Sequence, residues 1–294
     1  MRYIATLVAI VFLAPLVAHA AAYPGDEDVI GVVRNDTVQA GDSLVELARR
    51  YDLGINAVAE ANPALDPFVP KTGAPVTVPT GWIVPHATEP GTIVVNLSEM
   101  RLYYLYYQDE VSFLVTFPIG IGSEGAETPP GTYRVIEKTV SPDWHVPSSI
   151  KKEKPWLPPV VPAGPDNPLG SHALRLSEGS IMIHGTNKPW GVGRRVSHGC
   201  IRLYPEDIPR LFRLVSLETP VAVVREPVKV GVRGGRVFVE VHRDDELKID
   251  YIREADRLLE EKWLLEQVDP AKLYSAILEK KGVPVDITEL GGTK

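Results

Sequence analysis

Residues 181–203 read IMIHGTNKPWGVGRRVSHGCIRL, and this stretch holds the only cysteine of the 294-residue chain, Cys200. The apolar residues at its start predict a strand that ends at His184, and the glycines and arginines after it predict a loop. Pro205-Glu206-Asp207, followed by apolar residues at helical spacing, predicts the start of a short helix. Cys200 is therefore expected on a turn rather than inside a core helix.

This pattern predicts nucleophilic catalysis. A cysteine attacks as its thiolate, and an ordinary thiol with a pKa of about 8.5 is mostly protonated near neutral pH, so a base is needed. His184 is the predicted base, and the carbonyl oxygen of Gly185 is expected to orient its ring. Gly199 lets the backbone approach a reacting carbonyl group, and the amides of His198, Gly199 and Cys200 are expected to bind the oxyanion.

Three arginines surround the cysteine in the sequence: Arg194, Arg195 and Arg202. We expect them to lower the pKa of the thiol or to bind a substrate carboxylate. A zinc site made of the two histidines and the cysteine is an alternative, but the arginines would repel a dication and a fourth ligand has to be found. A buried, inert cysteine is the other alternative, and the turn residues around it argue against that.

The first residues predict export. Arg2 precedes the apolar stretch 4–17, and Ala18-His19-Ala20 fits a cleavage site, which predicts a signal peptide at 1–20. An uncleaved membrane anchor is the alternative, but the apolar stretch is shorter than the ~20 residues that span a bilayer. An unpaired thiol in an oxidising compartment is a liability unless it has a role, which favours a functional Cys200. The net charge of −7 argues against a nucleic-acid partner.

A small α+β module is predicted at 36–80, with the order strand, helix, helix, strand. The first strand is expected at 37–39, and Asp42 or Ser43 is expected to cap the first helix. Asn56 is expected to cap the second helix. A returning edge strand is expected at residues 74–79.

A mainly β domain is predicted at 91–225, after a linker at 81–91. Between 142 and 168 there are eight prolines in 27 residues, so we expect a long ordered loop beside the active centre, or a purely structural loop as the alternative. The strands are expected at 93–97, 101–106, 111–117, 131–138, 173–176, 181–184 and 219–224.

The tail at 226–294 is predicted to be an α+β extension. Alternating valines on both sides of Gly234-Gly235 indicate a β-hairpin. A helix is expected from about 252 to 267, and a second helix is expected to begin after Asp269 as its cap and Pro270 at its first turn. We assign no chemistry to this extension and expect it to cover one edge of the catalytic domain.

His184-Gly185-Thr186 and the run from Ser197 to Arg202 together resemble the signature of the L,D-transpeptidase (YkuD-type) catalytic domain. Residues 38–44 and 55–63 resemble LysM modules, which bind cell-wall glycan; a helical spacer without a ligand is the alternative. The likeness is greatest to the periplasmic enzymes that attach Braun-type lipoprotein to peptidoglycan. The resemblance implies a mainly β catalytic domain, a YkuD-like β-sandwich with a short helix after the catalytic cysteine, beside the two α+β parts.

The resemblance also implies a reaction. Cys200 would attack the carbonyl that links diaminopimelate to the terminal D-alanine of a tetrapeptide stem, release D-alanine and keep the rest as a thioester. His184 would move the proton. A lysine of a lipoprotein, or the amine of another diaminopimelate in a 3-3 cross-link, would then resolve the thioester. The route needs no metal and no organic cofactor, and it implies acylation by carbapenems.

The partners implied by this resemblance are peptidoglycan stem peptides and glycan, with a lipoprotein as acceptor, for a monomeric protein in the periplasm. A hydrolase that passes the acyl group to water and a non-catalytic LysM protein that only binds the wall remain alternatives. The predicted catalytic residues are Cys200, His184, Gly185, His198, Gly199 and Ser197, and the predicted substrate contacts are Arg202, Arg195, Arg194 and Trp190.

Overall fold

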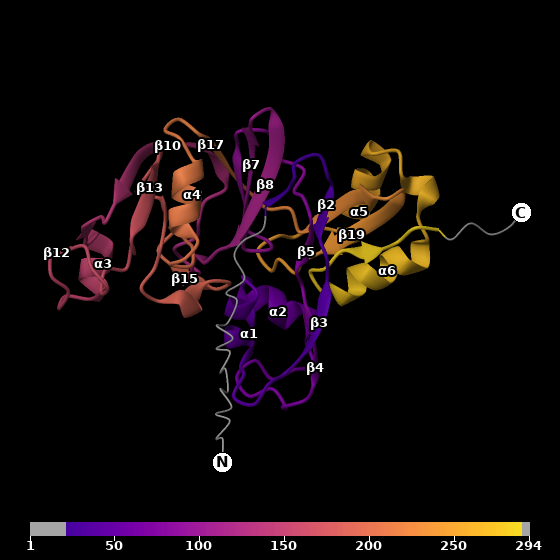
Figure 1. The fold of residues 1–294 in the computed structure, drawn as a ribbon, viewed down its shortest axis with the longest axis horizontal. Coiled ribbons are helices and arrows are strands. Elements are labelled where there is room, and N and C mark those ends of the chain that lie inside the picture. The colour runs from indigo at the N-terminus through magenta and orange to yellow at the C-terminus, as the bar shows by residue number, and fades with distance from the viewer. Residues whose placement is uncertain (1–21, 290–294) are drawn as a thin grey trace, which may run out of the picture.

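The computed structural model describes residues 22–289, so the predicted signal peptide at 1–20 lies outside the described residues. Figure 1 shows a central sheet, the small N-terminal module with α1 and α2 on one side of it, and the C-terminal helices α5 and α6 at the end remote from α3. Within the described range, no helix combines the length and the apolar character needed to cross a membrane.

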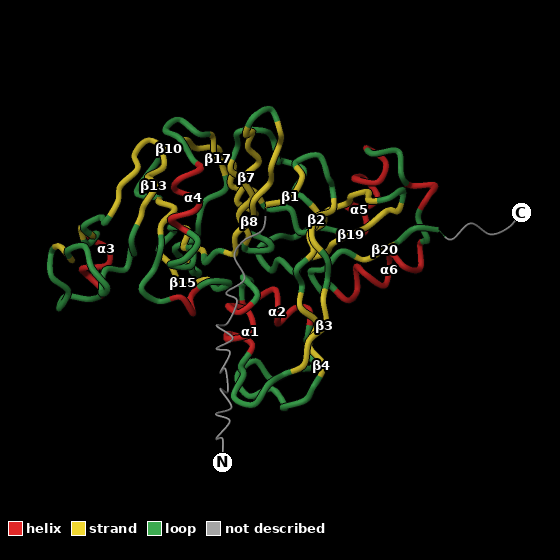
Figure 2. Tube along the Cα trace, in the orientation of Figure 1, coloured by secondary structure: helices red, strands yellow, loops and turns green. Residues whose placement is uncertain are grey.

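One nine-stranded sheet forms the centre, in the order β1-β8-β7-β6-β17-β10-β13-β14-β16. Its neighbours pair antiparallel, except for the parallel pairs β6–β17 and β14–β16. Figure 2 shows these strands in yellow. The strands are β1 (Ala22–Pro24), β6 (Ile93–Asn96), β7 (Arg101–Gln108), β8 (Val111–Pro118), β10 (Gly131–Val140), β13 (His172–Leu176), β14 (Met182–His184), β16 (Ile201–Arg202) and β17 (Pro220–Val224).

The expected β-sandwich needs a correction, because the strands form one curled sheet rather than two stacked sheets. Phe117 on β8 and Ile183 on β14 lie toward opposite ends of the strand order, yet both belong to one buried cluster. Leu211 on α4 (Ile208–Leu214) joins the same cluster. The sheet curls because strands from both of its ends bury their apolar side chains around this helix.

The N-terminal module has the expected element order: β3 (Arg34–Thr37), α1 (Leu44–Arg50), α2 (Ile55–Ala61) and β4 (Pro75–Val78). Ser43 caps α1 in a capping box: its hydroxyl accepts from the backbone of the first turn, and Glu46 accepts from the Ser43 N–H at 3.0 Å. β3 pairs with β4, but it begins and ends earlier than the predicted strand at 37–39.

The predicted cap at Asn56 is wrong. Asn56 lies inside α2, and the N-cap is Gly54, which makes no side-chain cap. The Asn56 amide instead donates to the carbonyl oxygen of Glu99 at 2.8 Å, because this end of α2 lies against the catalytic domain. The outer face of the sheet shares a second buried cluster with the module, in which Leu47 of α1 and Tyr103 of β7 take part.

Part of the expected linker at 81–91 is a strand. β5 (Gly81–Ile83) pairs antiparallel with β2 (Val29–Gly31), a segment for which the sequence pattern predicted nothing. β1, just before β2, pairs with β8 and so extends the catalytic sheet. The N-terminal residues thus join the catalytic sheet through β1, while β2 and β5 pair with each other before and after the small module.

The proline-rich segment at 142–168 contains short regular elements. β11 (Trp144–His145) pairs with β12 (Val160–Val161), and α3 (Ser148–Glu153) lies between them. The helix forms where the sequence between Pro147 and Pro155 is free of proline, and Pro147 at its N-cap removes no helical hydrogen bond.

The C-terminal part combines a sheet and helices. It contains β18 (Val228–Arg233), β19 (Arg236–Val241), β20 (Val285–Asp286), α5 (Tyr251–Glu261), the 3-10 turn η2 (Leu265–Gln267) and α6 (Pro270–Glu279). A helix was predicted over 252–267, and its predicted C-terminal boundary is wrong. It stops at Glu261 because Trp263 takes a left-handed backbone conformation with φ of 58°, which interrupts the helix.

Candidate active site

A cavity of about 440 Å³ contains both Cys200 and His184 in its wall. One wall comes from the proline-rich segment, through residues such as Trp144 and Ile150, and the other comes from β10, β13 and β14. The segment expected beside the active centre therefore lies there. A half-open cavity with a thiol and an imidazole in its wall can admit a substrate carbonyl beside both groups.

Strand pairing brings the two residues together. β14 runs parallel to β16, with Ile183 opposite Ile201 and His184 opposite Arg202. Cys200 directly precedes β16, so the parallel register places it beside the start of β14. The amide of Leu203 donates to the carbonyl oxygen of His184 at 2.9 Å and fixes the two chain segments to each other.

His184 is buried and held as one tautomer. Its Nδ1–H donates to the carbonyl oxygen of Gly185 at 2.6 Å, which leaves Nε2 as the proton acceptor. Burial and, to a smaller extent, the Arg202 cation together lower its pKa to about 4, although the carbonyls of Gly185 and Leu169 act in the raising direction. The imidazole is therefore a neutral base at pH 7.

The Cys200 thiol is partly exposed to the cavity, and its Sγ lies 3.6 Å from the carbonyl oxygen of Ser180. Burial raises its pKa, although a hydrogen bond from the backbone of Met182 and the cations Arg202 and Arg175 act in the lowering direction. The thiol and the imidazole are thus both neutral in the free protein, and a thiol becomes a nucleophile only when it loses its proton.

The turn that carries Cys200 is fixed by backbone geometry. Gly199 has φ of 94°, which favours glycine, and an added Cβ there would lie 3.3 Å from the carbonyl oxygen of Glu127. The buried Ser197 hydroxyl donates to the carbonyl oxygen of Cys200 at 2.5 Å. The Thr128 hydroxyl donates to the carbonyl oxygen of Gly199 at 3.0 Å and so ties the turn to the segment that carries Thr128.

Comparison with known proteins decides the family. Residues 90–223 match the family model described as the L,D-transpeptidase catalytic domain (YkuD), and residues 37–79 match the LysM domain. "Probable L,D-transpeptidase YcfS" of Escherichia coli (strain K12) is 41% identical over 233 residues, which cover 76% of this chain and 71% of that protein. The chain belongs to the L,D-transpeptidase family. It also carries a LysM domain.

Two further similarities concern the same family. "Probable L,D-transpeptidase ErfK/SrfK" of Escherichia coli (strain K12) is 37% identical over 260 residues, which cover 83% of this chain and 82% of that protein. The NMR structure of the catalytic domain from E. faecium L,D-transpeptidase is 24% identical, covers 47% of this chain and 99% of that chain, and has a TM-score of 0.36. The chain is therefore an L,D-transpeptidase on the strength of its family match and its relatives in sequence.

Only one of the four predicted substrate contacts of this L,D-transpeptidase lies in the cavity wall among the described residues. Arg202 lies in the cavity wall, whereas Trp190, Arg194 and Arg195 are not among the residues that form it. Trp190 lies on the 3-10 turn η1 (Pro189–Gly191) and is more than half exposed. Arg195 begins β15 (Arg195–Ser197), which pairs with β9 (Ile121–Gly122), and its guanidinium pairs with Glu246.

His198 and the two glycines of the motif also have defined places. His198 is exposed, lines the cavity, and its Nε2 lies 3.2 Å from a carboxylate oxygen of Glu153 on α3. Gly185 supplies the carbonyl that orients His184, and an added Cβ at Gly185 would come within 2.9 Å of the Ile208 side chain. Small size at Gly185 thus lets α4 approach the end of β14.

Sequence reasoning missed Arg175, Glu137 and Thr128. Arg175 and Glu137 lie in the cavity wall, and alternation along β13 was a usable signal, because Arg175 stands between the buried Leu174 and Leu176. Thr128 had no such signal. Its role depends on a contact with Gly199, a residue 71 positions away.

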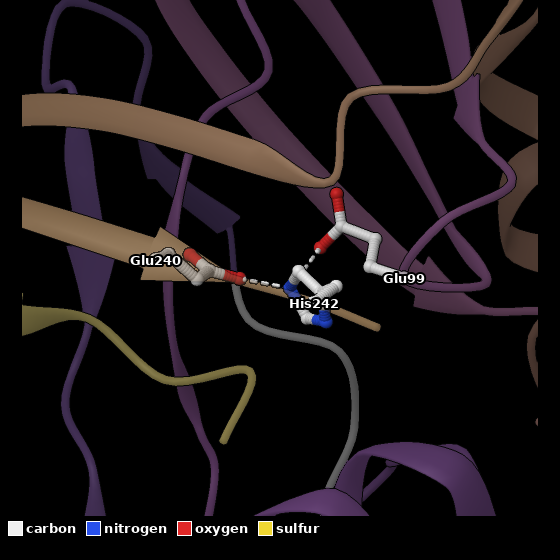
Figure 3. A group of neighbouring side chains, drawn as sticks. All are labelled: Glu99, Glu240 and His242. Atoms are coloured by element: carbon white, nitrogen blue, oxygen red, sulfur yellow. Dashed lines mark hydrogen bonds and ion pairs between the residues drawn. The ribbon is translucent and has the colours of Figure 1, made fainter. Parts of the chain in front are cut away.

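A separate group of ligand-type side chains lies outside the cavity wall. Figure 3 shows Glu99, Glu240 and His242, which each offer one atom within 4.8 Å of the others. The Lys229 ammonium already lies 2.9 Å from Glu99 and 3.0 Å from Glu240, so a cation neutralises these carboxylates. Burial acts to lower the pKa of His242, but hydrogen bonds to Glu240 and Glu60 raise it to about 10.

The protonated His242 ring donates from both nitrogens, so it has no lone pair for a metal ion. Glu99 belongs to the catalytic domain, while Lys229, Glu240 and His242 belong to the C-terminal part. Glu240 also accepts from the backbone amide of Ile83 on β5. The group fits a buried ion-pair network that joins these parts of the L,D-transpeptidase better than a metal centre.

Proposed function

We propose that this protein acts on peptidoglycan tetrapeptide stems through a Cys200 acyl-enzyme and transfers the acyl group to an amine, with a lysine of a lipoprotein as the acceptor. The observation that carries the proposal is the shared cavity, whose wall contains both Cys200 and a buried His184 with its Nδ1–H bonded to Gly185, which leaves Nε2 as the proton acceptor. The family match supports the reaction class.

In the first half-reaction, Cys200 Sγ forms a bond to the carbonyl carbon between diaminopimelate and the terminal D-alanine. The thiol proton moves to Nε2 of His184, and the ring then gives it to the nitrogen of the departing D-alanine. The amide bond breaks and a thioester remains. Backbone amides at Gly199 and Cys200 support the oxyanion, and the fixed turn around Gly199 keeps them in place.

In the second half-reaction, an acceptor amine gives a proton to His184 and attacks the thioester. The carbon–sulfur bond breaks, and the proton returns from the imidazole to the sulfur. A lysine side chain and the side-chain amine of a second diaminopimelate are chemically equivalent here, so 3-3 cross-linking is the second candidate. The match of 37–79 to LysM supports binding of the wall glycan, and export to the periplasm follows from the predicted signal peptide at 1–20.

Mass spectrometry of the purified protein with tetrapeptide muropeptides and a lysine-ended peptide tests this proposal. A muropeptide–peptide adduct is expected, with loss of D-alanine; a muropeptide dimer indicates cross-linking and a tripeptide alone indicates hydrolysis. Cys200→Ala is expected to abolish D-alanine release while binding to isolated cell-wall sacculi is retained. Equal release by Cys200→Ala and the wild type would show that the acyl-enzyme mechanism is wrong.

A further inference from the structure

An ion pair with an open side lies in the cavity wall. Glu137 on β10 is directly opposite Arg175 on β13, and Arg175 Nε donates to Glu137 Oε2 at 2.9 Å. The other carboxylate oxygen of Glu137 accepts from the Thr139 hydroxyl at 2.9 Å. The Arg175 side chain is 44% exposed and the Glu137 side chain is 53% exposed. Among residues 22–289, no hydrogen bond is made by the two terminal nitrogens of Arg175. The pair therefore offers unused donors beside an anion.

Strand register explains why this pair faces the nucleophile. Leu174 and Leu176 are buried in the core, so Arg175 between them points to the opposite face of β13. The register with β14 places Arg175 opposite Met182, whose backbone hydrogen-bonds to the Cys200 thiol. The Arg175 cation also acts to lower the pKa of that thiol. The ion pair and the sulfur thus belong to the same stretch of cavity wall.

A zwitterionic amino-acid head group fits both charges of this pair. Its carboxylate can accept two parallel hydrogen bonds from an arginine fork, and its ammonium can donate to a carboxylate. The third residue of the donor stem in the proposed function, diaminopimelate, ends its side chain in such a head group, with an ammonium and a carboxylate on one carbon. A lysine at the same place carries the ammonium but lacks the carboxylate.

We propose that Arg175 and Glu137 together bind the zwitterionic end of the diaminopimelate side chain while the backbone carbonyl of that residue faces Cys200. This inference rests on the proposed function and names the residues that select its donor. Arg202 is a less suitable partner for the head group, because its charge acts directly on both His184 and Cys200, which places it at the reacting centre. Arg175 binds the carboxylate, and Glu137 binds the ammonium.

The test uses three tetrapeptide donors that differ only at the third residue: diaminopimelate, diaminopimelate with its side-chain carboxyl amidated, and lysine. D-Alanine release gives kcat/KM for each donor. The wild type is expected to prefer diaminopimelate. Arg175→Gln is expected to lower kcat/KM for diaminopimelate by about 10- to 100-fold relative to the other two donors, which corresponds to the loss of a charged hydrogen-bonded contact. Glu137→Gln is expected to lower kcat/KM for all three donors, because each donor keeps the side-chain ammonium that Glu137 binds.

Two controls separate recognition from other effects. Arg134→Gln removes the cation of a matched exposed pair, since Arg134 on β10 lies 3.9 Å from Glu218 outside the cavity wall, and it is expected to leave all donor ratios unchanged. The rate of Cys200 alkylation by iodoacetamide measures any direct effect of Arg175→Gln on the reactivity of the sulfur. Such an effect changes kcat/KM for all three donors equally, so it cancels in the ratio of kcat/KM between donors.

The outcomes distinguish this inference from the proposed function. An active wild type whose preference for diaminopimelate over lysine survives in Arg175→Gln would overturn the assignment of Arg175 and Glu137. Release of D-alanine that Cys200→Ala performs equally well would instead overturn the acyl-enzyme reaction on which the inference rests. A lost preference in Arg175→Gln, with Arg134→Gln unchanged, would support both.

Discussion

Acidification tests the environment of His184 most directly. In the proposed mechanism the neutral imidazole is the base, and its burial together with the Arg202 cation lowers its pKa to about 4, against 6.5 for an ordinary histidine. At pH 5.5 a base of pKa 4 is still about 97% neutral, whereas a base of pKa 6.5 would be only about 9% neutral. The structure therefore predicts a rate at pH 5.5 that is about ten times higher than an ordinary histidine would allow.

The same shift has a consequence for stability, and its sign follows from proton uptake. Between pH 6.5 and about 4 the unfolded chain binds a proton at His184 that the folded protein does not bind, so the free energy of unfolding falls as the pH is lowered through this window. The 2.5-unit difference corresponds to about 3 kcal/mol. Folding must therefore be monitored at each pH, since loss of structure would also lower the rate.

The assay is single-turnover acylation of Cys200 by excess tetrapeptide donor from pH 4 to pH 8, quenched and read by intact-protein mass spectrometry. Near-ultraviolet circular dichroism at each pH defines the range in which the protein is folded. Within that range we expect the rate to hold between pH 8 and pH 5.5 and to halve near pH 4. A rate that halves near pH 6.5 while the fold is intact would refute the neutral, buried base.

Two substitutions test other parts of the structure. Lys229→Met leaves the buried carboxylates Glu99 and Glu240 without their ammonium partner, so we expect about 3–5 kcal/mol of destabilisation and a melting temperature about 6 to 20 °C lower, measured by circular dichroism. Arg257→Met, which breaks an exposed ion pair, is the control and is expected to cost about 1 kcal/mol or less. Equal shifts in the melting temperatures of the two variants would contradict the buried network. Thr128→Val removes the hydroxyl that hydrogen-bonds to both Gly122 and Gly199, so we expect a lower kcat with little change in KM. Thr128→Ser, which keeps the hydroxyl, is expected to recover the kcat. An unchanged kcat in Thr128→Val would contradict the positioning role of this hydroxyl.

Local signals in the sequence were sufficient for much of the fold. The capping box at Ser43 and Glu46 is a contact within one helical turn, so the start of α1 was predictable from neighbouring residues. The strands β6, β7 and β8 form a meander of consecutive strands, and their alternation and turns are also local. The end of β14 and the start of α4 on either side of Cys200 were predictable for the same reason, whereas the short strands β15 and β16 lie in the segment predicted as a loop and depend on distant partners.

Contacts between distant segments were not predictable in this way. Asn56 has the residue type of a helix cap, but its amide bonds to Glu99, which belongs to another part of the chain. Arg175 showed the alternation of a strand, yet only the register of β10, β13 and β14 places it beside Glu137 and near Cys200. The unpredicted strand β2 depends on β5 for its hydrogen bonds, and a three-residue strand has too little pattern of its own.

Arg195 shows how the C-terminal part reaches the turn that carries Cys200. Its nearness to Cys200 in sequence suggested a contact with substrate, but its guanidinium pairs with Glu246, which also pairs with Arg225 at the end of the catalytic domain. Arg195 begins the short strand that ends at Ser197, and Ser197 in turn hydrogen-bonds to the carbonyl of Cys200. The ion pair, the short strand and this hydrogen bond thus link Glu246 to Cys200. The extension is therefore joined to the active site by this ion pair, as well as to the sheet by the buried charges of Lys229 and its partners.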